Sequence, residues 1–576
     1  MAPVKERRRS KETPHSHKNG VASCPIIKLL GKELQEEVAS AGHLMDYIHG
    51  LEIDIIGIPE YHKELGRRVG DMKNPNVIYP IRGGLYVHVY PDPKDARNFY
   101  YAIEPGMNVD SNGLMELLEN NLVDYVDDLD DLGGRDQIDR KKKLLAILKK
   151  ICVITKPRDL EKAREKSEKK DEGKLPVTRE QYETLKYELI RDKEGLGQLE
   201  PLILDPYIED ISCSGVGPIF LEHKIFKGLK SNIVFDDFQT LDDFVIKLSE
   251  RIGKPATFRQ PIIDATLPDG SRINMVFGQD VSRRGSNFTI RKFSETPLSI
   301  VELVEFGGLS YEMAAYLSLA MHHGQNIFVS GETASGKTTL MNALTTFIPA
   351  ASKIVSIEDT PELQVPHPNW IRGVIRASTG DSGSSVDMFD LLRAALRQRP
   401  DEIIIGEIRG AEGAVAFQAM QTGHACMATF HADSVEKLIQ RLTGNPILIP
   451  KTYIDNLNLV AIQSMVRLPN GKPGRRLISL NEIVGYDSAS DSFSYVEVFK
   501  WDAAKDIFEF PGYMNSYMLE EVIAMKRGLP PSRKREIYDE LTRRTNLLRR
   551  LKEQGITGFY EIYQVLAQAN KEGIFK

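Results

Sequence analysis

The stretch that determines the fold reads Gly331-Glu332-Thr333-Ala334-Ser335-Gly336-Lys337-Thr338-Thr339. The apolar run 326–330 (NIFVS) precedes it, and residues 340–344 (LMNAL) have the character of a helix. A strand, a loop bounded by glycines and a helix that begins with Lys and Thr are the full context of a phosphate-binding loop. Because Gly331 and Gly336 carry no Cβ, successive backbone N–H groups can turn toward phosphate oxygens at the positive end of the helix dipole. The sequence therefore predicts that residues 331–339 bind a nucleoside triphosphate, with ATP and Mg²⁺ as the expected cofactors.

Two side chains of this loop have specific expected roles. Lys337 is expected to reach the β- and γ-phosphates, and the Thr338 hydroxyl is expected to hold Mg²⁺. A second apolar strand, 402–406 (EIIIG), ends at Glu407, about 70 residues after the loop lysine. In phosphate-loop proteins a carboxylate in this place holds the water shell of Mg²⁺, so Glu407 is the second expected metal residue, where Asp is more usual.

Two further strands end in polar side chains. The run 354–357 (IVSI) leads into Glu358, which we expect to orient the water that attacks the γ-phosphate. A helix-capping role for Glu358 and the acid after it is the alternative. The strand near 425–430 lies between His424 and His431, which are seven residues apart and so point to opposite faces of an extended strand. Joint metal ligation is therefore disfavoured, and we expect these histidines to sense the γ-phosphate or to link it to a neighbouring subunit.

Length and composition limit the remaining possibilities. The chain has 576 residues with 41% hydrophobic and 27% charged residues, which predicts two to four globular domains. A net charge of −6 gives no general attraction to nucleic acid, so no stable nucleic-acid complex is expected. The four cysteines form no CxxC pair, which argues against structural zinc and against a disulfide scaffold. No apolar run is long enough to cross a bilayer, and we expect a cytoplasmic protein.

The pattern of charge and hydrophobicity predicts six regions. Apolar runs that alternate with helical segments indicate a mostly parallel sheet buried on both faces, which is typical of an α/β domain. The expected regions are a basic disordered tail (1–20), an N-terminal accessory domain (21–155), a charged linker (156–178), an α+β domain (179–296), the α/β domain (297–500) and a C-terminal helical appendage (501–576).

The order of these motifs resembles that of one superfamily. The loop, the strand with Glu358, the strand with Gly406-Glu407-Ile408-Arg409 and the segment with both histidines resemble the Walker A motif, Asp box, Walker B motif and His box of the type II/type IV secretion ATPases. The segments 201–211, 268–272 and 288–291 resemble the domain that precedes the motor in that superfamily. Within the superfamily, the chain looks most like the archaeal branch of pilus, secretion and archaellum motors. This resemblance implies a RecA-like motor domain.

The resemblance also implies partners. It implies a homo-hexameric ring with nucleotide sites between subunits, a flexible hinge at residues 294–297, and a polytopic membrane platform protein that holds the ring at the inner face of the cell membrane. Arg272 and Arg291 resemble the arginines of the preceding domain that offset charge in the transition state. Arg393, Arg397 and Arg409 are further candidates in the motor domain.

The expected function is ATP hydrolysis that drives the assembly of type IV pilus-like filaments or protein secretion. A DNA-translocating motor of the same superfamily is one alternative. A scaffold that senses nucleotide without turning it over is another, and the acidic and basic residues of the expected site argue against it.

Overall fold

The computed structural model describes residues 25–70, 72–93, 95–106, 112–125, 137–164, 174–293, 296–376 and 385–574. The expected basic tail, part of the charged linker and the first two residues of the expected hinge lie outside these ranges. The chain divides into two compact units, residues 1–293 and residues 294–576. Within the described residues, no helix is both long enough and apolar enough to cross a membrane.

A ten-stranded sheet forms the centre of the first unit, in the order β1-β2-β3-β4-β9-β8-β7-β12-β11-β10. Strand β4 pairs in parallel with β9, so residues from the expected accessory domain and from the expected α+β domain share one sheet. The finer division of this unit stays a prediction. Its strands are β1 Glu60–Tyr61, β2 Val77–Ile81, β3 Leu85–Pro91, β4 Asn98–Ile103, β7 Ile208–Cys213, β8 Gly217–His223, β9 Lys227–Phe235, β10 Ile262–Thr266, β11 Arg272–Val276 and β12 Asn287–Arg291, with a separate pair β5 Cys152–Ile154 and β6 Leu175–Val177.

The helices of the first unit pack in three places, in one of which α11 and α12 contribute to the core of the ten-stranded sheet. Helices α1 to α3 cover β2, β3 and β4, where their leucines and valines meet Ile78, Tyr86 and Ile103. Helices α6, α8 and α10 form a small core of their own. The helices are α1 Pro25–Leu29, α2 Lys32–Ser40, α3 Gly42–His49, α4 Ile53–Ile56, α5 Arg67–Gly70, α6 Asn112–Leu122, α8 Gln137–Ile151, α10 Arg179–Lys193, α11 Glu200–Leu204 and α12 Phe238–Arg251.

The second unit contains a nine-stranded sheet in the order β15-β14-β16-β17-β13-β18-β19-β20-β21. The six strands from β15 to β18 are parallel, and the last three continue the sheet as antiparallel ribbons. All four strands expected around the motifs are present. The strands are β13 Ile327–Gly331, β14 Ile354–Glu358, β15 Trp370–Val374, β16 Glu402–Ile405, β17 Ala425–Phe430, β18 Leu459–Arg467, β19 Pro473–Asp487, β20 Ser492–Asp502 and β21 Ile507–Glu509. The sheet thus continues past residue 500, where we expected it to end.

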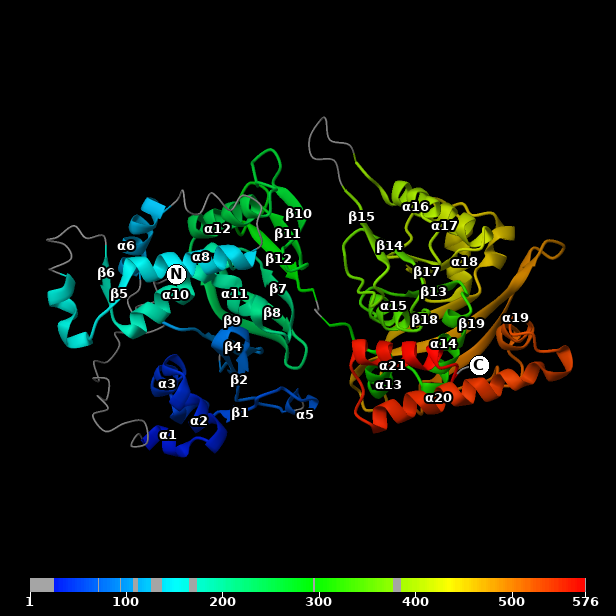
Figure 1. The fold of residues 1–576 in the computed structure, drawn as a ribbon, viewed down its shortest axis with the longest axis horizontal. Coiled ribbons are helices and arrows are strands. Elements are labelled where there is room, and N and C mark those ends of the chain that lie inside the picture. Colours follow the sequence, from blue (N-terminus) through cyan, green and yellow to red (C-terminus); the bar gives the residue numbers. More distant parts are fainter. Residues whose placement is uncertain are drawn as a thin grey trace. The chain divides into compact units, whose positions relative to one another are not determined.

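Side-chain alternation explains why this sheet is buried on both faces. Along β13, Ile327 and Val329 enter one core, and Phe328 between them enters the other. Helices α14, α15, α20 and α21 contribute to the first core, and α16, α17 and α18 contribute to the second. Figure 1 shows the C-terminal helix α20 beside α13 and α14. The helices are α13 Ile300–Glu305, α14 Tyr311–His322, α15 Lys337–Thr345, α16 Met388–Arg397, α17 Glu412–Gln421, α18 Val435–Thr443, α19 Ala524–Lys526, α20 Ile537–Glu553 and α21 Phe559–Lys571.

Candidate nucleotide-binding site

The phosphate loop joins the end of β13 to the start of α15, as its sequence predicts. Gly336 lies immediately before α15 with φ of 97°, and Gly331 has φ of 154°. A Cβ on Gly331 would come within 2.0 Å of the Gln463 carbonyl oxygen, so only glycine fits there. Ala334 has φ of 61°, a left-handed conformation that is uncommon for a residue with a side chain. The loop is therefore tightly curled, with its backbone N–H groups near the start of a helix.

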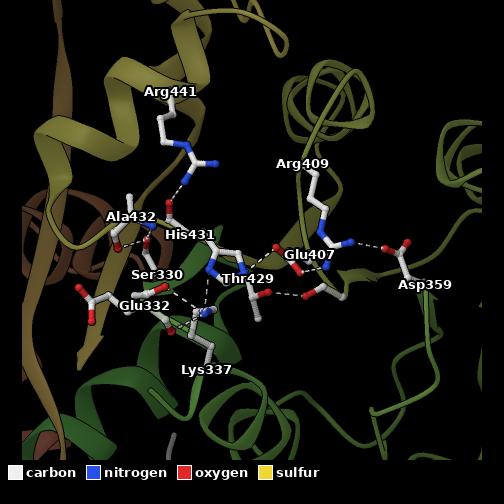
Figure 2. A network of polar contacts seen from close by, with 12 residues as sticks. Ser330, Glu332, Lys337, Asp359, Glu407, Arg409, Thr429, His431, Ala432 and Arg441 are labelled. Atoms are coloured by element: carbon white, nitrogen blue, oxygen red, sulfur yellow. Dashed lines mark hydrogen bonds and ion pairs between the residues drawn. The ribbon is translucent and has the colours of Figure 1, made fainter. Parts of the chain in front are cut away.

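Lys337 sits over this loop in the first turn of α15. Its ammonium donates hydrogen bonds to the carbonyl oxygens of Gly331 (2.9 Å) and Glu332 (2.8 Å), and its Nζ lies 3.5 Å from His431 Nδ1. The residue is 8% exposed. Burial lowers the pKa of Lys337, and the nearby charge of Glu407 opposes that effect. Figure 2 shows the ammonium between the loop carbonyls and the imidazole.

Glu407 lies between His431 and Arg409. Its Oε1 lies 2.7 Å from His431 Nε2, and its Oε2 accepts a 2.6 Å hydrogen bond from Arg409. Arg409 also donates to Asp359 Oδ2 at 3.0 Å, as Figure 2 shows. Burial would raise the pKa of Glu407, but the hydrogen bond and charge of Arg409, together with the nearby His431 and Lys337, outweigh the effect of burial, and the net pKa is lowered. Glu407 therefore stays ionised at neutral pH.

The contacts of His431 assign its tautomer. Burial and the charge of Lys337 lower the pKa of His431, although Glu407 acts in the opposite direction. A neutral imidazole has one donor and one acceptor nitrogen. Because Nε2 faces a carboxylate and Nδ1 faces an ammonium, the proton belongs on Nε2. His431 thus links Glu407 and Lys337 through its two ring nitrogens.

A cavity of about 330 Å³ opens beside this network. It is lined by Gly331, Glu332, Thr333, His431, Ala432, Asp433, Lys437 and Arg441. Ser335, within the loop, is 1% exposed, and its hydroxyl has no hydrogen-bond partner among the described residues. A buried hydroxyl without a partner is costly unless a ligand supplies one. The loop is therefore suited to an oxygen-rich ligand such as a phosphate group.

Glu358 lies at the end of β14, next to the strand that leads to Glu407, and is 2% exposed. Its Oε1 accepts hydrogen bonds from the backbone N–H groups of Glu362 and Leu363, each at 2.7 Å, and its Oε2 accepts one from Arg372 at 3.2 Å. Burial raises the pKa of Glu358, while these donors act in the opposite direction. The carboxylate thus holds its own loop. Its role toward a water molecule stays a prediction.

The structure does not bring His424 to the loop. His424 precedes β17, His431 follows it, and the carboxyl end of β17 lies beside the carboxyl end of β13. His424 instead lies 3.1 Å from the Thr422 hydroxyl, at the opposite end of the strand. In the first unit, Arg272 and Arg291 face each other across β11 and β12. Arg291 also lies 3.4 Å from Asp210 and is 66% exposed.

The remaining expected residues lie in two places. Thr338 and Thr339 follow Lys337 in the first turn of α15, and Arg393 and Arg397 are exposed on α16. Two contacts at the site, one to His431 and one to the loop, were not expected from the sequence. Arg441 donates to the His431 carbonyl oxygen, and Arg475 donates to the Ala334 carbonyl oxygen at 3.0 Å. Both are ordinary basic positions in the sequence, and no motif marks them.

The sequence matches known proteins over most of its length. The family model described as "Type II/IV secretion system protein" matches residues 192–494, just over half of the chain. The Methanocaldococcus jannaschii protein MJ0900 is 40% identical over 551 residues, which are 95% of this chain and 98% of that protein. The type IV secretion system protein VirB11 of Bartonella quintana is 32% identical over 219 residues, 32% of this chain; the match spans 61% of VirB11.

Solved structures show a more distant likeness. The VirB11 ATPase from the Brucella suis type IV secretion system is 24% identical, covers 48% of this chain and 90% of its own, and has a TM-score of 0.24. The pilus retraction motor PilT with bound ADP is 18% identical, with 63% and 90% covered and a TM-score of 0.35. The family assignment rests on the sequence matches, which agree with the order of motifs on the sheet. The chain belongs to the type II/IV secretion system protein family, with a RecA-like α/β domain that follows an N-terminal α+β region.

Proposed function

We propose that this protein is an ATP hydrolase. The observation that carries the proposal is the chain of contacts from Lys337 through His431 to Glu407, beside a curled glycine loop and a cavity of about 330 Å³. Relatives in the same superfamily are described as ATPases, among them the VirB11 of Brucella suis. The buried ammonium of Lys337 and the Ser335 hydroxyl, which has no partner among the described residues, lie at a helix N-terminus and match the needs of a polyphosphate.

Each residue of the network has a distinct role in this proposal. On nucleotide binding, Lys337 exchanges the carbonyl oxygens of Gly331 and Glu332 for oxygens of the β- and γ-phosphates. His431 moves with it, because its Nδ1 faces the same ammonium. Thr338 and Glu407 are the residues that would hold Mg²⁺, and Glu407 would act through water, since Arg409 and His431 occupy both of its oxygens. When bound, Mg²⁺ would neutralise charge on the phosphate oxygens.

The preceding unit would supply positive charge. Arg272 and Arg291 are directly opposite each other on adjacent strands, and Arg291 also lies 3.4 Å from Asp210. We assign them the task of offsetting charge on the transferring phosphoryl group, in an oligomeric ring of six copies. The finer roles of Glu358 and His424 remain part of this proposal.

We infer from the relatives of this chain which process its ATP hydrolysis drives. Relatives include proteins of type IV secretion systems and a pilus retraction motor. We propose a ring at the cytoplasmic face of the membrane that acts on a polytopic platform protein to assemble a pilus-like filament or to export protein. A DNA-translocating motor remains the alternative, which stimulation of turnover by single-stranded DNA would favour.

Phosphate release from purified protein tests the enzymatic proposal. We expect Mg²⁺-dependent ATP hydrolysis by the wild type and a loss of about 100-fold or more in Glu407→Gln, the range for removing one preorganised charge from such a site. Glu402→Gln is the matched control, because it changes the same functional group at the opposite end of β16, and its turnover should equal that of the wild type. The proposal would be contradicted if the wild type did not hydrolyse ATP in any oligomeric state. It would also be contradicted if Glu407→Gln hydrolysed ATP as fast as the wild type. Light scattering with ATP then measures the number of subunits.

A further inference from the structure

The phosphate loop packs against a part of the sheet that carries none of the known motifs. Strand β13 pairs with β18, where Gly331 is opposite Gln463, and β18 pairs in turn with β19, where Met465 is opposite Arg475. The half of the β18–β19 hairpin that is nearer its turn therefore lies beside the loop. Both loop glycines face this hairpin. A Cβ on Gly331 would meet the Gln463 backbone, and a Cβ on Gly336 would lie 3.2 Å from Arg475 Cδ.

Arg475 makes one directed contact with the loop. Its Nε donates a 3.0 Å hydrogen bond to the carbonyl oxygen of Ala334. Ala334 is the loop residue with a side chain that has a left-handed backbone (φ 61°). A residue in such a conformation persists only where its surroundings hold it there. The charge-assisted bond from Arg475 holds the peptide between Ala334 and Ser335 from one side, and the N–H of that peptide donates to the Glu332 carbonyl oxygen at 3.3 Å.

The neighbour of Arg475 holds the strand in place. Arg476 is 5% exposed and forms two hydrogen bonds with Asp506, from Nε to Oδ1 at 2.7 Å and from a terminal nitrogen to Oδ2 at 2.8 Å. It also donates to the carbonyl oxygen of Phe306 at 3.1 Å. A bidentate pair of this kind has a fixed geometry. The backbone that presents Arg475 to the loop is therefore anchored on its buried side.

We propose that Arg475 is a positioning residue that keeps the phosphate loop in its nucleotide-accepting shape. It acts on the Ala334 side of the loop, whereas Lys337 acts on the carbonyl groups of Gly331 and Glu332. This inference rests on the proposed function, because the loop must bind ATP for its shape to matter. The bond is made to the loop backbone in the free protein, so it preorganises binding and does not stabilise the transition state in particular.

Steady-state kinetics of Arg475→Ala test the inference. We expect KM for ATP and the dissociation constant of a fluorescent ATP analogue to rise about 5- to 20-fold, with kcat within twofold of the wild type, as expected when uniform binding is lost. Arg475→Lys, which keeps a cationic donor, should recover part of the affinity. Arg467→Ala is the control, because Arg467 lies on the same hairpin and bonds only the Gly471 carbonyl of its own turn among the bonds the structure gives it.

A second measurement does not depend on turnover. In nucleotide-free protein, amide hydrogen exchange of residues 331–337 should be faster in Arg475→Ala than in the wild type and Arg467→Ala, with unchanged exchange in β16. Unchanged KM and unchanged exchange in Arg475→Ala would overturn the positioning role while leaving the ATPase proposal intact. A drop in kcat at constant KM would also overturn it. A wild type that binds no ATP analogue would instead refute the proposed function, and the inference with it.

Discussion

A buried carboxylate at the far end of the motif-bearing strand should make the second unit sensitive to alkaline pH. Glu402 begins β16, is 2% exposed, and has one carboxyl oxygen, Oε1, without a hydrogen-bond partner among the described residues. Burial, with a smaller effect from the charge of Asp401, raises the pKa of Glu402 to about 8. The side chain therefore carries its proton at neutral pH, where a glutamine would be its closest uncharged equivalent.

The sign and size of the effect follow from proton linkage. Between pH 4.5, the ordinary pKa, and about 8, the folded state binds a proton at Glu402 that the unfolded state has released. Stability contributed by this group is therefore full below pH 4.5 and is lost as the pH rises to about 8. The difference in pKa corresponds to about 5 kcal/mol over the whole range. For a unit of this size that is a shift of about 10 °C in Tm.

Thermal unfolding of Glu402→Gln from pH 5 to pH 9 measures this effect. Near pH 5 the variant and the wild type should have nearly equal Tm values. Near pH 8.5 the variant should be more stable, by up to about 10 °C. Glu509→Gln, an exposed carboxylate on β21 of the same sheet, is the control and should not change Tm at any pH. A Tm difference between Glu402→Gln and wild type that does not grow with pH would refute the reasoning.

Three further substitutions test the site. Glu358→Gln should keep ATP binding but lower turnover about 100-fold, because it removes a proton acceptor; full turnover in a phosphate-release assay would exclude Glu358 as the water-orienting group. Gly331→Ala should weaken binding of an ATP analogue at least tenfold, because the new Cβ would lie 2.0 Å from the Gln463 carbonyl oxygen. The control Gly42→Ala, whose Cβ would meet no atom of the described residues within 4 Å, should bind the analogue normally. Arg291→Ala should lower kcat at least tenfold with little change in Tm, since its side chain is 66% exposed; an unchanged kcat would remove it from the transition state.

The sequence predicted those parts of the molecule where local chemistry dictates structure. A glycine-bounded loop between a strand and a helix leaves few alternatives, so the positions of Lys337 and Gly336 followed directly. The apolar runs that became β13, β14, β16 and β17 are short, rich in branched residues and free of alternation, as expected for strands buried on both faces. Their parallel order then brings Glu407 and His431 to one edge of the sheet.

Other features depend on pairing between distant segments, which the sequence does not encode locally. Arg475 reaches the loop only because β19 pairs with β18, and β18 with β13. His424 shares a motif with His431, yet the two histidines lie at opposite ends of β17, which separates them. Arg544 reads as one of several basic residues on α20, but it is 3% exposed and bonds Glu540 and the Ser318 hydroxyl of α14.

The ten-stranded sheet has a mechanical consequence for how such a protein could be loaded. Backbone hydrogen bonds between β4 and β9 join strands β2 to β4 to the part of the sheet that carries Arg272 and Arg291. Two side-chain contacts add to this connection. Tyr79 of β2 and Tyr100 of β4 both donate hydrogen bonds to the buried carboxylate of Asp205, which follows α11. A partner that binds the helices over β2 to β4 would thus transmit force to the arginine pair through hydrogen-bonded strands of one sheet.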